Sequence, residues 1–340
     1  MDSATESPMT FVGLGQTGFN DDGFFVLRGR GGIPARVMLP FEDICQNPRL
    51  ICERDMPAVP HLLAIINLTA LSKGVLPLHA SAFTIDSMGV LVTGWAKSGK
   101  TESLLGCMSE GARYVGDEWV YLTQDGRMFG LPEPIRLWAW HLQQLPALLR
   151  SRPLGGRLRL SAWKTAAVMA SAWSHSRIPG SAVMRKGSPI ISRQAYLQIP
   201  PEEIFGEGTV ALQARFEVAI LVVSHEKPEI VIESTGQSEL SGRMAASLSD
   251  ERADFLAHYR QFRYARPETT NAAIDNAEAT ELALLRNLLD NLPSAKVLHP
   301  YPCDITALGR AVVSAAHHIV ASPQVADPFD DRVPTGSMHG

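Results

Sequence analysis

A glycine-rich run that ends in lysine and threonine offers the clearest chemistry in the sequence. It matches the Walker A pattern GxxxxGK[ST] with Gly94, Trp95, Ala96, Lys97, Ser98, Gly99, Lys100 and Thr101. In this pattern backbone N–H groups turn toward phosphate oxygens, and the N-terminus of the following helix adds partial positive charge. We expect Lys100 to face solvent and reach the β- and γ-phosphates of ATP, and the Thr101 hydroxyl to bind Mg²⁺.

The residues on both sides of this run fit the same interpretation. The apolar segment 89–93 predicts a short buried strand before the glycines, and 102–110 places leucines on one face of a helix that ends at Gly111. A strand, a glycine loop and a helix in this order are the context that the motif requires. The alternative is a glycine turn between a strand and a helix that binds nothing.

Two adjacent acids, Asp117 and Glu118, follow the predicted loop helix. We place both on the next strand, where successive side chains point to opposite faces, so only one of them faces the phosphates. We favour Asp117 as the carboxylate that meets the metal of the nucleotide or an acceptor hydroxyl. The alternative is a solvated acidic pair at the end of a strand.

A single histidine, His79, lies on the strand expected before the loop strand, among small residues. Imidazole can take up or release a proton near neutral pH, so a catalytic role is one interpretation. A hydrogen-bonded structural histidine is the other, and both stay open at this point.

The segment 79–122 resembles the catalytic core of the HPr kinase/phosphorylase family, which is related to the phosphoenolpyruvate carboxykinase-type P-loop fold. In that family a histidine precedes the loop strand, an acid follows the GKS/T end of the loop, and two aspartates come after the loop helix. The matching positions here are His79, Gly99, Lys100, Thr101, Glu102, Asp117 and Glu118.

The resemblance implies that Asp117 acts as the base toward a serine hydroxyl. The chain departs from the family pattern at Glu118, where the family has a second aspartate, and at Ala80, where it has glycine. A counterpart of the family's downstream loop that engages a protein substrate is not recognisable. The chain therefore resembles divergent members of the family.

Composition limits the partners and the compartment. The 340 residues are 45% hydrophobic and 19% charged with a net charge of −4, which is typical of a globular protein and gives no attraction to nucleic acid.

The four cysteines, Cys45, Cys52, Cys107 and Cys303, lack the CxxC spacing of a zinc site and fit reduced thiols. The polar N-terminus does not look like a signal peptide, and no apolar run reaches membrane-spanning length. We expect a cytoplasmic protein without nucleic-acid or membrane partners.

Hydrophobic patterning predicts the remaining elements. Short antiparallel strands are expected at 10–14, 24–28 and 35–39, a buried helix within 60–74, a strand pair at 218–223 and 229–233, and helices at 242–262 and 277–292. Asp304 is the expected cap of a last helix. Interleaved tryptophans and arginines within 140–190 suggest a mobile or substrate-facing segment.

These elements predict an α/β fold with a P-loop core, a mixed sheet and a helical C-terminal part, as in the HPr kinase and phosphoenolpyruvate carboxykinase folds. We expect one domain over 1–321, made of a β-rich preface with a helix (1–74) and the nucleotide-binding core with its helices (75–321). The tail 322–340 is proline-rich and acidic, which predicts disorder.

Two functions fit this pattern. The first is an ATP- and Mg²⁺-dependent kinase that transfers the γ-phosphoryl group to a hydroxyl acceptor, either a serine of a protein or peptide or a small molecule. The second is a non-catalytic regulatory or assembly protein that is switched by ATP occupancy. Both bind nucleotide and both are compatible with a homo-oligomer. Reversible phosphorolysis has no signal of its own in the sequence.

Overall fold

The computed structural model of the chain describes residues 8–13, 16–27, 36–53, 59–146, 148 and 196–321. Within these stretches the chain has a mixed α/β structure with four β-sheets. No helix of this described part is both long and apolar enough to cross a membrane. The predicted tail 322–340 lies outside the described residues, and so does the predicted segment 140–190 except for 140–146 and 148.

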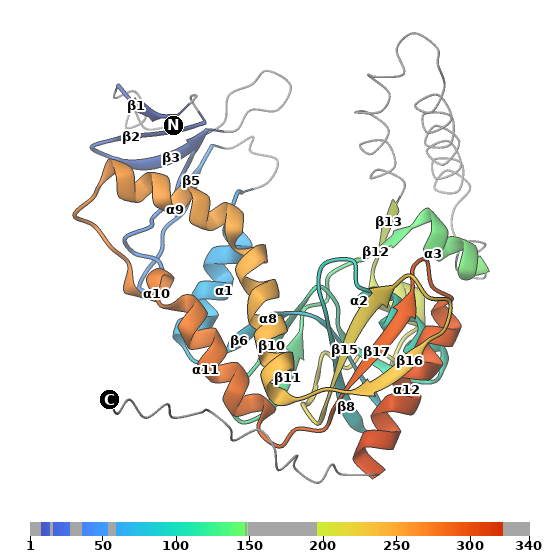
Figure 1. Cartoon of the computed structure of the whole chain (residues 1–340). Coiled ribbons are helices and arrows are strands. Elements are labelled where there is room, and N and C mark those ends of the chain that lie inside the picture. Colours follow the sequence, from blue (N-terminus) through green and yellow to red (C-terminus); the bar gives the residue numbers. More distant parts are fainter. Residues whose placement is uncertain are drawn as a thin grey trace, which may run out of the picture.

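A six-stranded sheet forms the centre of the part of the molecule that carries the glycine loop (Figure 1). Its strands are β7 (Ser81–Ile85), β8 (Met88–Thr93), β9 (Arg113–Gly116), β15 (Val218–His225), β16 (Val231–Ser234) and β17 (Ser294–Pro300). The order is β16-β17-β15-β8-β7-β9, in which β8 and β17 run parallel to β15 and the other neighbours are antiparallel. The predicted mixed sheet is thus confirmed. The carboxyl ends of its three parallel strands share one edge, where ligands often bind in α/β proteins.

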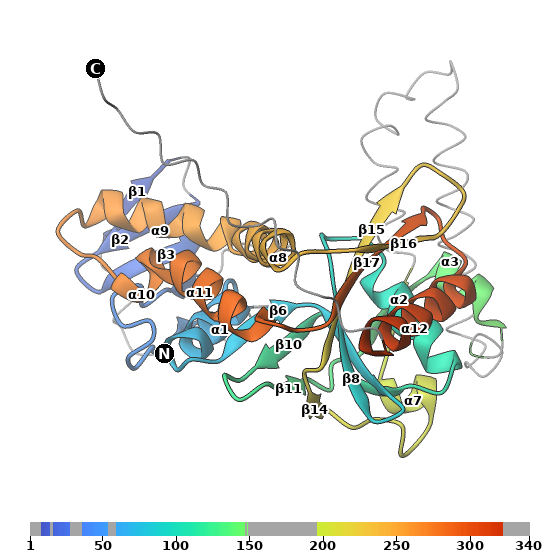
Figure 2. The same ribbon diagram turned by 60° about the horizontal axis from the view of Figure 1, so that its bottom comes forward.

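Two helices, α2 (Lys100–Ser109) and α12 (Ile305–Ala321), cover one face of this sheet and lie side by side (Figure 2). They approach closely because each has a glycine at the crossing: a Cβ on Gly309 would lie 2.3 Å from the carbonyl carbon of Gly106. Buried side chains of both helices and of β8, including Leu104, Val312 and Val92, form one hydrophobic cluster. This packing fixes the position of α2 and therefore the end of the glycine loop.

A four-stranded antiparallel sheet packs on the other face. Its strands are β6 (Leu76–His79), β10 (Trp119–Leu122), β11 (Arg127–Gly130) and β14 (Gln213–Arg215), in the order β14-β11-β10-β6. Val120 and Met128 of this sheet share a hydrophobic cluster with Leu91 and Leu221 of the central sheet. The chain crosses from the central sheet into this one between β9 and β10, and the crossing consists of the two acids predicted as site residues.

The same hydrophobic cluster continues into a group of helices and the N-terminal sheet. The helices are α1 (Leu62–Ser72), α8 (Gln237–Glu251), α9 (Ala253–Ala265), α10 (Ala272–Asp275) and α11 (Ala277–Leu289). The sheet is an antiparallel meander of β1 (Thr10–Val12), β2 (Thr17–Asn20), β3 (Gly23–Leu27), β4 (Arg36–Met38) and β5 (Ile51–Cys52). It lies against α9 (Figure 1), where the ring centroid of Phe24 in β3 is 5.9 Å from that of Phe262.

A two-stranded ribbon completes the described structure next to the glycine loop. It consists of β12 (Ile135–Trp138) and β13 (Tyr196–Ile199), and it is flanked by the short helices α3 (Ala139–Gln144) and α7 (Pro201–Phe205). Ile135, Leu137, Leu197 and Ile199 of the ribbon belong to the cluster that also holds α2 and α12. The ribbon is therefore anchored to the same layer as the loop helix.

Most predicted elements are confirmed with shifts of a few residues. The three N-terminal strands correspond to β1, β3 and β4, and the predicted strand and helix around the glycine loop correspond to β8 and α2. Gly111 has φ 94° just after α2, as expected of a left-handed cap. Asp304 caps α12, because its Oδ1 accepts a hydrogen bond from the Ala307 N–H at 2.8 Å.

Three predictions were wrong. The segment 242–262 is two helices, α8 and α9, with Arg252 between them. The strands predicted at 218–223 and 229–233 do not pair with each other, because β17 lies between β15 and β16. Asp117 and Glu118 lie in a bend rather than on a strand, and Glu118 has φ 65°. The rule of alternating faces therefore does not apply to the two acids.

Candidate functional site

The glycine loop connects the carboxyl end of β8 to the first turn of α2. Gly94 leaves room for the loop, since a Cβ there would lie 2.2 Å from the Ser98 hydroxyl oxygen and 2.5 Å from the Val222 carbonyl oxygen. Gly99 has φ 101°, a left-handed conformation that glycine adopts without strain. These two glycines allow the tight turn that brings the loop back over the end of the sheet.

Lys100 is buried, with 6% of its surface exposed, so the expectation that it faces solvent is wrong. Its ammonium group donates to the carbonyl oxygens of Gly94 at 3.0 Å and Trp95 at 2.9 Å. Burial lowers the pKa of the lysine, while the carboxylates of Asp117 and Glu118 act in the opposite direction. The side chain thus folds over the loop, and its ammonium group connects the loop backbone at Gly94 and Trp95 to the start of α2.

Asp117 is buried and lies beside the start of α2. Its carboxylate accepts a hydrogen bond from the Ser81 hydroxyl, and Thr101 Oγ1 lies 3.1 Å from its Oδ2. Burial raises the pKa of Asp117 to about 6, although the hydroxyls of Ser81 and Thr101 pull the pKa down. Ser81 was not among the predicted site residues, because a serine on a strand carries no signal by itself.

Glu118 turns away from Asp117 and contacts His79, whose Nε2 is 3.2 Å from Glu118 Oε2. His79 Nδ1 lies 2.5 Å from Oε1 of Glu251, and its ring stacks on Trp119 at a centroid distance of 5.8 Å. Burial lowers the pKa of His79, but the two carboxylates outweigh burial and leave its pKa above the ordinary value. Glu251 is the last residue of α8 and was not predicted, because it is distant in sequence from every recognised motif.

Glu102 connects the loop helix to α3. Its Oε1 lies 3.0 Å from Nε2 of His141, and the backbone N–H of Trp138 donates to Nδ1 of the same ring at 3.1 Å. Since Nδ1 accepts, Nε2 carries the proton and donates to Glu102. Burial raises the pKa of Glu102, but the bond from His141 outweighs it and the net pKa is lowered. Sequence reasoning singled out Glu102 and missed His141.

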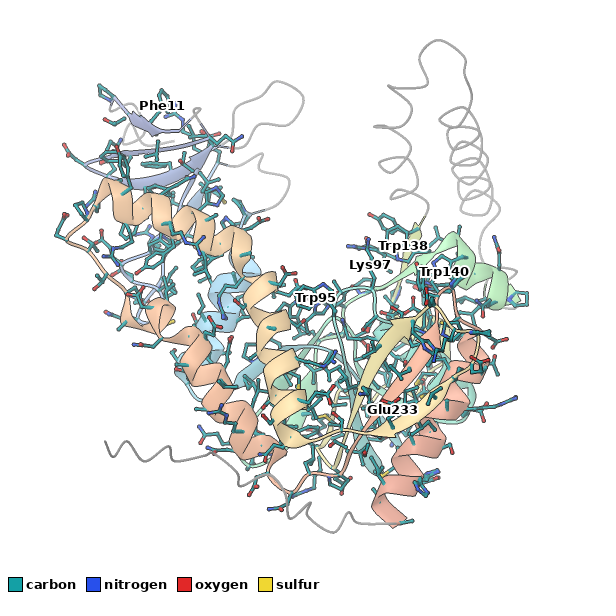
Figure 3. The ribbon with its side chains drawn as sticks, in the orientation of Figure 1. Phe11, Trp95, Lys97, Trp138, Trp140 and Glu233 are labelled. Atoms are coloured by element: carbon teal, nitrogen blue, oxygen red, sulfur yellow. The ribbon has the colours of Figure 1, made fainter. Side chains whose placement is uncertain are left out.

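These groups surround one cavity of about 410 Å³. Its lining residues are His79, Ala96, Lys97, Gly99, Lys100, Thr101, Glu102, Asp117, Glu118, Arg136, Trp138, Trp140, His141 and Tyr301. The glycine loop and the acids form part of the lining, and Trp138, Trp140 and Tyr301 form an aromatic wall; Lys97, Trp138 and Trp140 are labelled in Figure 3. Arg136 stands in the aromatic wall with its guanidinium 5.1 Å from the centre of the Tyr196 ring.

The fold thus brings most of the predicted site residues to this cavity. Gly94, Trp95 and Ser98 do not line it: Trp95 is 52% exposed at the outer side of the loop, and Ser98 is buried beneath it. Arg136 and Tyr301 line the cavity but were not predicted, because an isolated arginine or tyrosine lacks a recognisable spacing.

The oxygen atoms of Thr101 and Asp117 fit a magnesium ion. A hydroxyl and a carboxylate that already point at each other supply the hard oxygen ligands that Mg²⁺ takes, together with phosphate oxygens and water. Among the described residues there is no group of three or more His, Cys, Asp or Glu side chains that could hold a metal alone. An ion here would therefore depend on a bound phosphate for its remaining ligands.

Comparisons with known proteins add little to this geometry. No protein-family model matches the chain. No curated protein matches it either. Among solved structures, the Hpr(Ser) kinase/phosphatase from Coxiella burnetii matches at 16% identity over 53% of this chain and 97% of that chain, with a TM-score of 0.22. A TM-score of this size supports no conclusion about the fold or function of this chain. The functional interpretation therefore rests on the residues of the cavity.

Proposed function

We propose that the chain is an ATP- and Mg²⁺-dependent phosphotransferase that transfers the γ-phosphoryl group to a hydroxyl acceptor. The observation that carries this proposal is the contact of Thr101 with the buried Asp117 beside Lys100, all within one cavity. A glycine loop followed by a helix N-terminus binds phosphate through its N–H groups. A carboxylate next to that loop is what phosphoryl transfer requires in addition.

The triphosphate would lie along the loop, with its terminal phosphates against the N-terminus of α2. Lys100 already points inward, so its ammonium group can exchange the carbonyl oxygens of Gly94 and Trp95 for phosphate oxygens. Thr101 would hold Mg²⁺ together with phosphate oxygens, and the ion would neutralise charge on the phosphates, while the neighbouring Asp117 contacts the acceptor. Arg136 faces the same space and supplies a second cation near the transferred group.

In the transfer step the acceptor oxygen attacks the γ-phosphorus, the new P–O bond forms, and the bond to the ADP oxygen breaks. The hydroxyl proton of the acceptor passes to a carboxylate. A pKa of about 6 suits Asp117 for this role, because it is ionised at neutral pH and still basic enough to take the proton. Under this proposal His79, held by Glu118 and Glu251, orients the acceptor side of the cavity.

The proposal is tested by isothermal calorimetry with Mg·ATP and by a transfer assay against serine-containing peptides and small polyols. The expected result is Mg²⁺-dependent binding by the wild type and a phosphorylated product from one acceptor class. Binding that is absent at millimolar Mg·ATP would overturn the whole proposal.

A second candidate is a nucleotide-dependent switch without turnover. The observation that favours it is the Glu102–His141 contact, which links the first turn of the loop helix directly to α3. Nucleotide that shifts this turn would shift α3 as well. Binding of Mg·ATP by the wild type, with no transfer to any acceptor and no hydrolysis, would support the switch over the kinase. In both proposals we treat 1–321 as a single domain and the chain as cytoplasmic.

A further inference from the structure

His299, at the carboxyl end of β17, lies directly beneath the glycine loop and has no exposed surface. Its Nε2 is 2.6 Å from the carbonyl oxygen of Ser98, and its Nδ1 is 2.9 Å from the carbonyl oxygen of Pro300. Carbonyl oxygens accept hydrogen bonds and cannot donate them. Donation to both oxygens would require a proton on each ring nitrogen, which would make the imidazole a cation.

The bond to Ser98 also determines how the next peptide N–H points. In a trans peptide the C=O of one residue and the N–H of the following residue point in opposite directions. Since the Ser98 carbonyl points down to His299, the Gly99 N–H points the other way, and Gly99 lines the cavity. The histidine thus aims one loop N–H at the space proposed for phosphate.

Gly99 packs directly against the ring, which couples the two residues sterically. A Cβ on Gly99 would lie 2.5 Å from His299 Nε2, closer than atoms of neighbouring groups approach. Only glycine fits between the ring and the cavity at this position. Its left-handed φ of 101° is a second reason, because other residues adopt this conformation only with strain. The ring therefore supports the loop from below at its closest point to the start of α2.

We propose that His299 is a positioning residue for phosphate binding: its cationic ring holds the Ser98–Gly99 peptide with the N–H toward the phosphates and adds positive charge beneath them. This inference rests on the proposed function. A buried cation is costly unless it is hydrogen-bonded or paired. Here two carbonyl oxygens are bonded to the ring, and Glu102, whose pKa the charge of His299 helps to lower, is a nearby anion.

The test compares His299→Gln with the wild type. Glutamine retains one N–H that can reach the Ser98 carbonyl but has no charge, so the loop keeps its support and loses the cation. His225→Gln is the matched control, because His225 ends the neighbouring strand β15 and its ring contacts the Glu229 carbonyl oxygen instead of the loop. The probes are Mg·ATP, Mg·ADP and inorganic tripolyphosphate, titrated by calorimetry.

We expect His299→Gln to bind Mg·ATP and tripolyphosphate about tenfold or more weakly, in line with the loss of a charged partner. The loss should be smaller for Mg·ADP, which carries less charge, and His225→Gln should bind like the wild type. In nucleotide-free wild type, ¹⁵N NMR of the His299 ring should show both nitrogens protonated at neutral pH. A merely structural role of His299 would not require two protonated ring nitrogens. Nor would it make the loss of affinity depend on the charge of the phosphate ligand.

The outcomes separate this inference from the proposed function. Wild type that binds no Mg·ATP overturns the proposed function, and the role of His299 with it. Wild type that binds, with His299→Gln binding equally well, overturns only the role of His299. A ring with one protonated nitrogen also overturns it, and this measurement decides the matter if His299→Gln does not fold.

Discussion

Thr101 donates a hydrogen bond to Asp117, with Thr101 Oγ1 3.1 Å from Asp117 Oδ2 and 3.3 Å from Oδ1. The hydroxyl belongs to the glycine-loop pattern, whereas the carboxylate comes from the bend between two sheets. Ser81 donates to the same carboxylate from β7, so two hydroxyls hold one buried acid. Under the proposed function, metal and phosphate would enter at this contact.

Replacing Lys100 by methionine keeps the aliphatic stem and removes the ammonium group. Affinity for Mg·ATP should fall about 10- to 100-fold, because a hydrogen bond to a charged group contributes roughly 1.5–3 kcal/mol. Stability without nucleotide should fall as well, by about 1–3 kcal/mol, since the buried ammonium donates to Gly94 and Trp95. Calorimetry and urea unfolding measure the two effects. Lys73→Met, at an exposed lysine after α1, is the control and should change neither. Unchanged ATP affinity in Lys100→Met would contradict the loop assignment.

The raised pKa of Asp117 predicts a pH-dependent stability. The pKa is about 6 in the folded protein against an ordinary value of 3.8, so the folded state binds more protons between these values. Stability should therefore decrease as pH rises from about 4 to about 6, by roughly 3 kcal/mol for a shift of about two units. Asp117→Asn removes this dependence and should be the more stable protein at pH 7. Urea unfolding of both proteins at pH 4, 5, 6 and 7 tests the point, and a difference that stays constant with pH would refute it.

Glu251 of α8 should control the protonation of His79. Its carboxylate lies beside His79 Nδ1 and helps to raise the pKa of the ring, so Glu251→Gln should lower that pKa, as NMR titration can measure. A raised histidine pKa stabilises the folded state below the ordinary value and loses this effect as pH rises through the folded value. The variant should therefore lose stability mainly below pH 6.5.

The control is Asp250→Asn, at an exposed residue one position earlier in α8. Identical titration curves for His79 in all three proteins would disprove the coupling.

The glycine crossing of α2 and α12 predicts opposite effects of the same substitution at two helical glycines. Gly309→Ala forces a Cβ to within 2.3 Å of the Gly106 backbone and should destabilise the protein by several kcal/mol. Gly242→Ala in α8 meets nothing within 4 Å and should stabilise by about 0.5–1 kcal/mol. Chemical unfolding compares them. A tolerated alanine at Gly309 would mean that the helices can move apart.

Much of the strand, glycine loop and helix around Lys100 could be predicted from the sequence, because the signals for these elements are local. The strand, glycines and helix around Lys100 are contiguous, and their hydrophobic periodicity and turn residues are unambiguous. Strand β17 was missed because it is short, it ends in Pro300, and its alternation of polar and apolar residues breaks at Leu298. Missing it also hid His299 and the order of the central sheet.

The site was only partly predictable for a related reason. Asp117 was identified, but its setting was not, because the bend that turns it toward Thr101 exists only where the chain passes from one sheet to another. Arg136 lines the cavity, Ser81 contacts Asp117 and Glu251 contacts His79, each from a separate element, and only the folded topology shows these pairings. Lys100 was expected to face solvent, since its sequence does not reveal that two loop carbonyls hold it inside.

The most direct test of the proposed kinase is the turnover of Asp117→Asn beside the wild type and Glu118→Gln. Asparagine keeps the size and polarity of Asp117 and can still accept from Thr101, but it cannot take a proton. We expect phosphoryl transfer, or basal ATP hydrolysis where no acceptor is found, to fall about 10²–10⁴-fold in Asp117→Asn while Mg·ATP still binds. Glu118→Gln, which alters the partner of His79 instead, should retain more activity. Equal turnover in Asp117→Asn and the wild type would contradict the catalytic role of Asp117, and no turnover in the wild type with any acceptor would contradict the kinase itself.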